Sequence, residues 1–431
     1  MESLIDAHAE RGRAVALIGL LLLLGSAPVQ AARGQMVSDT TAPSPAALLP
    51  ADTLQPLTAL AVPQVAALGG NQSVYRPYRQ EPSVYFGAPP LRYNRVEGAV
   101  VGLQYPPLSW NDDAALQPFG QVSYALGIRR WRAVGGLEAR LVQPSSLQHY
   151  GLKVGGHVAH TTASEDVWKR SWQDNAVSAL VFGNDLYNYY DVRAVTAYVT
   201  QRFSSALQLT VGGRWSTHDA LPRTTDWSLL DPSAFRPNPP VDTGEVRLLL
   251  LSAEGGHLTR RTEARSVGTI ARLYAELGRW AGASLAYDRV IVDVQTYQAV
   301  TPSANVNLRG RVGWATADAP IQMQFRLDGV RGLRNTEPVG RAEERLLLGG
   351  AEWVWHDAPV PSWLRRAQVS VFTDVGWTGN RLFRDGQTFA FAGLGAGLFG
   401  RMLTVDVAWN LMAPRPDAWT PQVSVSVNPL R

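Results

Sequence analysis

The 431-residue chain contains no cysteine, and this absence removes two ways of holding an exported protein in place. The chain has no disulfide framework, and it lacks the cysteine that carries the lipid of a bacterial lipoprotein. Lysine is almost absent as well, since Lys153 and Lys169 are the two examples, so the isoelectric point of about 9.3 comes from arginine. These arginines are scattered along the chain and not clustered, so we expect no nucleic-acid partner.

Long apolar runs are also missing. Downstream of residue 24 no apolar run reaches the 18 residues or so that a membrane-spanning helix needs. The mean hydropathy of −0.10 is that of an ordinary soluble protein. Membrane-spanning β-barrels have similar values, because their lipid-facing side chains alternate with polar ones and the two average out.

The N-terminus has the layout of a secretory signal peptide. Arg11 and Arg13 precede an apolar block at residues 14–24, and the small-residue stretch SAPVQAA follows. An N-terminal membrane anchor is the alternative, but the apolar block is shorter than the roughly 20 residues that cross a bilayer. We therefore expect a signal peptide at 1–32, a disordered linker rich in Ala, Pro and Ser at 33–92, and one folded domain at 93–431.

Alternation of apolar and polar residues dominates that domain and predicts β-strands. Residues 304–314, for example, place four apolar side chains on one face and two asparagines and two arginines on the other. Two arginines facing lipid would be costly, so the polar face must line the interior. The expected strands are at 97–105, 118–128, 131–142, 150–161, 189–203, 206–216, 245–256, 266–277, 283–298, 304–315, 321–329, 345–356, 366–377, 388–399, 403–411 and 420–430.

These sixteen segments predict an all-β fold, a transmembrane antiparallel β-barrel. An even number is typical of single-chain bacterial barrels. The first half is less regular, and one strand pair miscounted there would give fourteen or twelve strands. Counting in order places the long stretches 162–188 and 217–243 on the periplasmic side, where turns are normally short. A soluble β-sandwich is the alternative, although so many long strands exceed what a single sandwich usually contains.

The segment IQMQFRLD at 321–328 alternates strictly, so it predicts a strand that leads into a loop. The loop begins with Val330, Arg331, Gly332 and Leu333. Glu352 and Asp374 occupy polar-face positions on the next two expected strands. A cation on the loop and two carboxylates on the inner wall suggest a loop that folds into the lumen and is tethered there.

From Tyr93 through the GVRGLR loop and Gly393 to the last strand, the chain resembles the bacterial surface antigen barrel of BamA-type and TamA-type assembly factors and two-partner secretion transporters. The resemblance covers about residues 93–431, and its last third is the specific part. It implies that Arg331 folds back into the barrel and contacts Glu352 and Asp374. A guanidinium can bind carboxylates through paired hydrogen bonds, which lysine cannot reproduce. Three ordinary lumenal charges, neutralised by water, are the simpler alternative.

The chain also departs from that family. The ~60 residues before Tyr93 are too few and too rich in proline for a periplasmic recognition repeat. No patatin-like domain and no Gly-x-Ser-x-Gly motif is found, and Leu333 replaces the usual aromatic residue of the loop. Pro429 near the C-terminus lacks a backbone donor, which is compatible with a loose seam between first and last strands but is also a simple strand terminator.

Other constellations give weaker signals. His157 and His160 lie three residues apart and so face opposite sides of a strand, which argues against a shared metal. His218 near Asp219 and His356 beside Asp357 raise the alternative of a lipid-modifying hydrolase. Residues 165–187 predict a short amphipathic helix, capped near Asp174, that plugs the pore, lies at the membrane surface or packs as a loop.

The combined expectation is a barrel in the outer membrane of a Gram-negative bacterium that inserts or translocates protein or lipid. Its partners would be outer-membrane lipids, unfolded outer-membrane or secreted polypeptides, and a periplasmic accessory protein. We expect no enzymatic activity, cofactor or metal site. A passive porin-like channel or structural barrel is the first alternative, and the hydrolase is the second.

Overall fold

The computed structural model describes residues 88–105, 115–142, 151–204, 206–230, 235–262, 265–279, 282–327, 341–356, 367–398, 403–412 and 420–427. The expected signal peptide, the linker up to residue 87 and the loop motif at 330–333 lie outside these ranges. No helix in the described part of the chain is long and apolar enough to cross a lipid bilayer.

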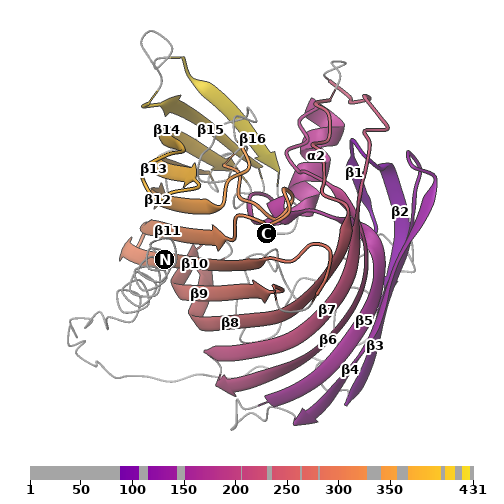
Figure 1. The fold of residues 1–431 in the computed structure, drawn as a ribbon. Helices are drawn as coiled ribbons and strands as arrows, with labels where there is room; N and C mark the ends of the chain where they lie inside the picture. The colour runs from indigo at the N-terminus through magenta and orange to yellow at the C-terminus, as the bar shows by residue number, and fades with distance from the viewer. Residues whose placement is uncertain are drawn as a thin grey trace, which may run out of the picture. The chain divides into compact units, whose positions relative to one another are not determined.

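The described residues form sixteen strands in one antiparallel sheet, in which each strand pairs with its neighbour in sequence. The strands are β1 (Arg92–Asn94), β2 (Gly98–Tyr105), β3 (Leu116–Ala125), β4 (Arg130–Val142), β5 (Gly151–Ala163), β6 (Tyr190–Ser204), β7 (Leu207–Ala220), β8 (Gly244–Thr262), β9 (Arg265–Leu277), β10 (Asp288–Thr301), β11 (Ala304–Ala315), β12 (Arg345–Trp355), β13 (Gln368–Gly379), β14 (Gln387–Leu398), β15 (Leu403–Asn410) and β16 (Gln422–Val427). Two helices, η1 (Glu165–Trp168) and α2 (Trp172–Phe182), interrupt the series between β5 and β6. The sheet curls into a barrel, and α2 stands near its first and last strands (Figure 1).

The predicted all-β fold and the number of sixteen strands are confirmed, but two errors cancel in that number. The three-residue β1 is too short to show alternation and was not expected. The expected strand at 321–329 is wrong, because residues 321–324 form turns and Phe325 makes an isolated bridge with Glu343. All other expected strands overlap an observed one, and the strand expected at 304–315 has the same bounds as β11.

The presence of β1, which was not expected, also changes the end of the sheet at which the long connections lie. Because neighbouring strands run in opposite directions, the connections β5–β6, β7–β8 and β11–β12 leave the sheet at one end. They hold residues 164–189, 221–243 and 316–344, and we call this end the plugged end. At the other end, β6 and β7 are separated by two residues. The expectation that 162–188 and 217–243 belong to the short-turn side is therefore wrong.

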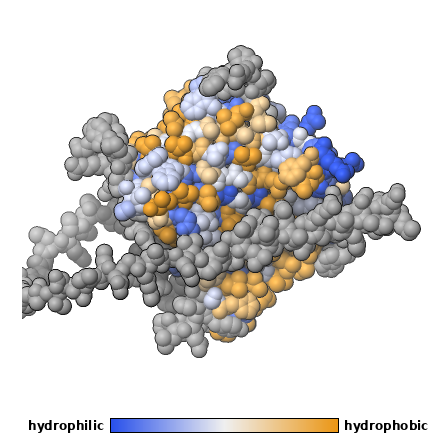
Figure 2. Space-filling model, turned by 90° about the vertical axis from the view of Figure 1, so that its left-hand side faces the viewer, coloured by the Kyte–Doolittle hydropathy of each residue, from blue (hydrophilic) through white to orange (hydrophobic). Residues whose placement is uncertain are grey.

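The two faces of the wall have opposite chemistry. In β7, Val211 and Trp215 are exposed on the outside, while Arg214, Ser216 and the other alternate residues are buried inside. β11 repeats the pattern, with Leu308 exposed and Arg311 buried, so the prediction that its polar face points inward is confirmed. Figure 2 shows apolar side chains, in orange, spread over the described part of one outer face.

Candidate functional site

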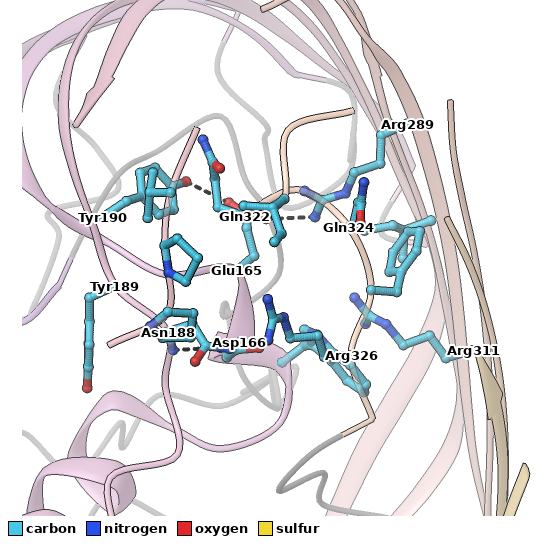
Figure 3. A pocket seen from close by; sticks show the side chains of 17 residues that line it. Glu165, Asp166, Asn188, Tyr189, Tyr190, Arg289, Arg311, Gln322, Gln324 and Arg326 are labelled. Carbon is cyan, nitrogen blue, oxygen red and sulfur yellow. Dashed lines mark hydrogen bonds and ion pairs between the residues drawn. The ribbon is translucent and has the colours of Figure 1, made fainter. Parts of the chain in front are cut away.

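The lumen is occupied by chain from the plugged end. After β5 the chain turns through η1, whose first turn is capped by the Ser164 side chain, which accepts a hydrogen bond from Asp166 N. Lys169 pairs with Asp166 at 2.7 Å and fixes the end of this turn. The turn directs Glu165 and Trp168 toward the inner wall, where they line a pocket together with Arg289 and Arg311 (Figure 3).

Arg289 of β10 joins the wall to this turn. Its Nη2 donates to Glu165 Oε2 at 2.6 Å, and its Nη1 lies 3.6 Å from Glu276 Oε2 of β9. Glu165 also accepts a hydrogen bond from the Tyr190 hydroxyl at 2.9 Å, and Glu276 accepts one from the Tyr287 hydroxyl at 3.0 Å. One buried guanidinium is thus shared between a carboxylate of the lumenal turn and a carboxylate of the wall.

A second contact to η1 is made by two wall arginines. Arg309 and Arg311 of β11 donate to Asp293 of β10 at 2.8 and 3.1 Å. Both guanidinium groups also face the Trp168 ring, at 5.6 and 4.1 Å from its centroid. The pairing with Asp293 fixes the arginines, and the arginines in turn hold the tryptophan by cation–π attraction.

Residues 321–327, the expected strand, fill another part of the lumen. Met323, Phe325 and Leu327 are buried in the largest apolar cluster, which contains inward-facing side chains of the wall. The Phe325 ring packs where Gly313 of β11 leaves room, since a Cβ there would lie 2.5 Å from two ring atoms. The alternation is real, but its apolar face covers the inner wall and not lipid.

This segment is bound to the β7–β8 connection by the side-chain amide of Gln322, which pairs with the backbone N–H and C=O of one residue. Gln322 Oε1 accepts from Asp242 N at 3.1 Å, and Gln322 Nε2 donates to Asp242 O at 2.9 Å. Asp242 Oδ2 accepts in addition from Ile321 N at 2.8 Å. Three hydrogen bonds therefore tie two long connections to each other inside the barrel.

The same amide also contacts His218 and favours one tautomer of its ring. Because its orientation is fixed by Asp242, the Gln322 Nε2 group donates to His218 Nδ1, 3.3 Å away. The ring proton then lies on Nε2 and faces Ser216 Oγ at 3.3 Å. A hydrolytic base needs the reverse arrangement, with an acceptor at Nε2. This geometry argues against a Ser216–His218 hydrolase.

The expected tether residues have the following positions. Arg331 and the rest of the loop motif, Val330, Gly332 and Leu333, lie outside the described residues. Asp374 of β13 is 4% exposed and sits on the inward face of its strand. Glu352 of β12 is half-buried and accepts a hydrogen bond from Asn307 Nδ2 at 3.3 Å. Within the described chain, the observed tether has the opposite polarity, with arginines on the wall and a carboxylate on the inserted turn.

The seam between the first and last strands lacks a backbone ladder among the described residues. Instead α2 contacts both β1 and β16 and stands between them (Figure 1). Its N-cap is Ser171, whose side chain accepts from Asp174 N, and not the expected Asp174. Ser426 Oγ of β16 donates to Asp174 Oδ2 at 2.7 Å. The expected helix therefore exists, and it lies at the seam while η1 enters the lumen.

The β1–β2 turn anchors the other side of the helix. Arg95 donates from its backbone N to Asp185 Oδ2 at 2.9 Å and from Nη1 to Asp185 O at 2.8 Å. Asp185 in turn accepts from Asn175 of α2 at 2.9 Å. Two residues on, Glu97 accepts from both Nε and Nη2 of Arg92 at 2.8 Å. Buried hydrogen bonds between charged groups therefore hold the β1–β2 turn in place.

Charge pairing lowers the pKa of two buried carboxylates outside the strands, Glu97 and Glu165. Burial alone would raise the pKa of Glu97, but the charge and hydrogen bonds of Arg92, with those of Thr162 and Asn94, outweigh it, so the pKa lies below its usual value. The same balance, with Arg289 as the cation, lowers the pKa of Glu165. Both groups are therefore charged at neutral pH.

Sequence reasoning identified the inward face but not the residues that act on it. Arg289, Asp293 and Glu276 look like ordinary polar positions of alternating strands, and Glu165 is the first residue of the segment 165–187 without a signal of its own. Trp168 lies in the same segment, and nothing in its sequence context indicates that arginines stack on it. Among the described residues, no group of three His, Asp or Glu side chains could hold a metal ion.

The chain resembles known proteins at low sequence identity. The model of a family described as a family of unknown function (DUF5686), C-terminal domain, matches residues 66–252. No curated protein matches the chain. Among solved structures, BamA from Haemophilus ducreyi lacking POTRA domains 1-3 is 12% identical, with 78% of this chain and 68% of that chain covered and a TM-score of 0.44. CdiB from Acinetobacter baumannii is also 12% identical, with coverages of 76% and 56% and a TM-score of 0.40.

Proposed function

We propose that the barrel spans the outer membrane of a Gram-negative bacterium. Its outside presents apolar side chains to the surroundings, such as Val195 at 54% and Val211 at 50% exposure, while arginines are buried inside. A soluble protein would gain by the opposite arrangement. Lipid is the environment in which an apolar outer surface and a charged interior are both stable.

Aromatic side chains mark the edges of this apolar surface. Trp131 and Trp215 are exposed toward the plugged end, and Tyr105 and Trp355 are exposed at the opposite strand ends. Such rings favour the two interfaces of a bilayer, where an apolar body and a polar tip are both accommodated. Short turns belong to the periplasmic side of bacterial barrels, so the plugged end would face outward.

We further propose that the barrel inserts or translocates polypeptide or lipid and has no enzymatic activity. The observation that carries this proposal is the seam, where, within the described parts of the first and last strands, α2 takes the place of a β1–β16 ladder. An unjoined pair of strand edges can accept another strand or admit a lipid chain. Outer-membrane lipids, unfolded outer-membrane or secreted polypeptides and a periplasmic accessory protein are the corresponding partners.

Reconstitution tests this function. Liposomes that contain the purified protein should accelerate the folding of a urea-denatured outer-membrane polypeptide, relative to empty liposomes. Absence of acceleration together with a large, steady conductance in planar bilayers would favour the passive channel. The occupied lumen and the clamp between Gln322 and Asp242 favour the insertion function over the channel.

For the loop motif, we propose that Arg331 binds the inner wall at Glu352 and Asp374. The support is that both carboxylates are on inward positions of β12 and β13. Arg331→Ala should increase protease cleavage within residues 330–343, and Arg331→Lys should give an intermediate rate because an ammonium lacks the paired geometry. Equal cleavage of the wild type and Arg331→Ala would contradict this role.

A further inference from the structure

The helix α2 has its polar and apolar sides reversed relative to a helix of a soluble protein. Asp174, Asn175 and Ser178 are buried beside Trp172 and Ala179, while Leu180 and Phe182 are among the exposed large apolar residues. The more exposed positions 173, 176, 177, 180 and 181 follow helical spacing and form one face, which is apolar apart from Gln173, and Phe182 is exposed beside it. The strands of the wall show the same arrangement, with apolar side chains outside and polar side chains inside.

The outward face of α2 continues the apolar surface of its neighbours. On one side of the seam Leu103 of β2 is 82% exposed, and on the other Val423 of β16 is 55% exposed. The helix contacts β1 and β16, the strands that end the sheet. α2 therefore completes the wall at the place where the strands do not, and lipid chains are the surroundings that suit its outer face.

The two sides of the helix are attached differently. Toward β1, Asn175 binds Asp185 and Tyr189, and Asp185 is held by the buried Arg95. The carbonyls of Leu180 and Val181 accept from the backbone of residues 229 and 230, in the connection that also bonds to Arg95 O. Toward β16, the helix is joined by the hydrogen bond between Ser426 and Asp174.

We propose that α2 is a movable part of the barrel wall that belongs mechanically to the β1 side, so that the seam opens between α2 and β16. This inference rests on the proposed function, because it names the boundary at which a client would enter. In the closed state the helix covers the edge of β16. Opening breaks the Ser426–Asp174 contact and leaves the Arg95–Asp185–Asn175 contacts intact.

Lipid exposure of the helix is tested first, and a chain without cysteine allows single-cysteine labelling. Val177→Cys and Ser178→Cys place a fluorophore on the outward and inward faces of the same turn. In phosphatidylcholine vesicles with brominated acyl chains, the label at 177 should be quenched severalfold more than the label at 178. Equal quenching at both positions would overturn the assignment of α2 to the wall.

Opening is tested by cross-linking. Asp174→Cys with Ser426→Cys, joined by a short bis-methanethiosulfonate reagent, should abolish conductance fluctuations and client insertion. The control pair Thr404→Cys with Ser426→Cys joins strands that are already paired and should leave both unchanged. Equal behaviour of the two cross-linked pairs, with wild-type heat stability confirming the fold, would overturn the proposal.

A point substitution gives a readout that needs no client. Asp174→Ala should increase the ratio of open to closed conductance states by about ten- to a hundredfold, the change expected for the loss of a hydrogen bond to a charged group. Gln173→Ala on the outward face is the control and should change it little. If Asp174→Ala opens the seam but no polypeptide is inserted, the movement of α2 is supported and the proposed insertion function is contradicted. If insertion proceeds and the cross-link has no effect, the movement of α2 is contradicted.

Discussion

At the scale of single residues, Arg289 shows how the interior depends on complete charge pairing. The residue is 2% exposed, and its guanidinium contacts both Glu165 and Glu276. Arg289→Ala would leave two buried carboxylates without their shared cation, and breaking a buried pair from one side costs about 3–5 kcal/mol. Urea unfolding of the barrel in lipid vesicles should show this loss.

The control for this substitution is a pair in contact with solvent. Arg279 lies 3.5 Å from Asp318, and the side chains are 49% and 52% exposed. Arg279→Ala should cost about 0–1 kcal/mol, because water screens exposed pairs. Similar losses for the two variants would mean that Arg289 is not the link between wall and lumenal turn.

Glu97 should give the barrel part of its acid sensitivity. Its pKa is lowered in the folded protein, chiefly because Arg92 outweighs the effect of burial. A lowered pKa adds stability that is fully present above the unfolded value of about 4.3 and is lost as the pH falls through the folded value. Glu97→Gln should therefore reduce the rise in unfolding free energy between acidic and neutral pH.

Glu344 provides a comparison of opposite sign. Burial raises its pKa, with Asp385 and Glu343 acting in the same direction against Arg345. A raised carboxyl pKa favours folding at low pH, and that contribution is lost as the pH rises through the folded value. Glu344→Gln should make the acidic-to-neutral rise larger, and a smaller rise in this variant would contradict the raised pKa of Glu344.

Which face a residue occupies could be predicted, but its partner could not. The period of two placed Arg309 and Arg311 inside, as observed. The pairing of Arg289 with Glu165 joins residues 124 positions apart, across a connection whose path is set by packing. No local pattern encodes such a contact, so the polarity of the observed tether could not be derived from the sequence.

At the scale of elements, residues 321–327 show why alternation does not always mean a strand. Period two gives an apolar face, and either lipid or the inside of the wall can cover it. The deciding residue is Gly313, on another element, because it provides the space for Phe325. A sequence window around 321 contains no information about that space.

Gly313→Ala should therefore displace this segment. The added Cβ would lie 2.5 Å from ring atoms of Phe325, and a rigid ring cannot yield as a flexible side chain can. We expect faster protease cleavage within residues 316–327 of the folded barrel. Gly310→Ala on the same strand meets nothing within 4 Å and should leave the rate unchanged. An unaltered rate in Gly313→Ala would show that the segment is held by other contacts.

At the scale of the whole molecule, the number of strands was easier to predict than the end of the barrel at which each connection lies. Repeated alternation and length gave sixteen, although one strand was missed and one was misassigned. Omitting the short β1 reversed the end to which the β5–β6 and β7–β8 connections were assigned. With β1 counted, the alternating strand directions bring these connections to the same end as the β11–β12 connection. Segments of these connections together fill the lumen.

The reversed surface makes the membrane assignment testable with one charge. Val211 lies near the middle of β7 and is half exposed on the outer face. If that face contacts lipid, Val211→Arg should lower the unfolding free energy in vesicles by about 2–4 kcal/mol, the cost of arginine at the midplane. Gln208→Arg on the same strand points inward and should cost far less. An arginine added to a water-exposed surface hardly changes the unfolding free energy. An equally small effect of both substitutions would therefore mean that water, and not lipid, surrounds the barrel.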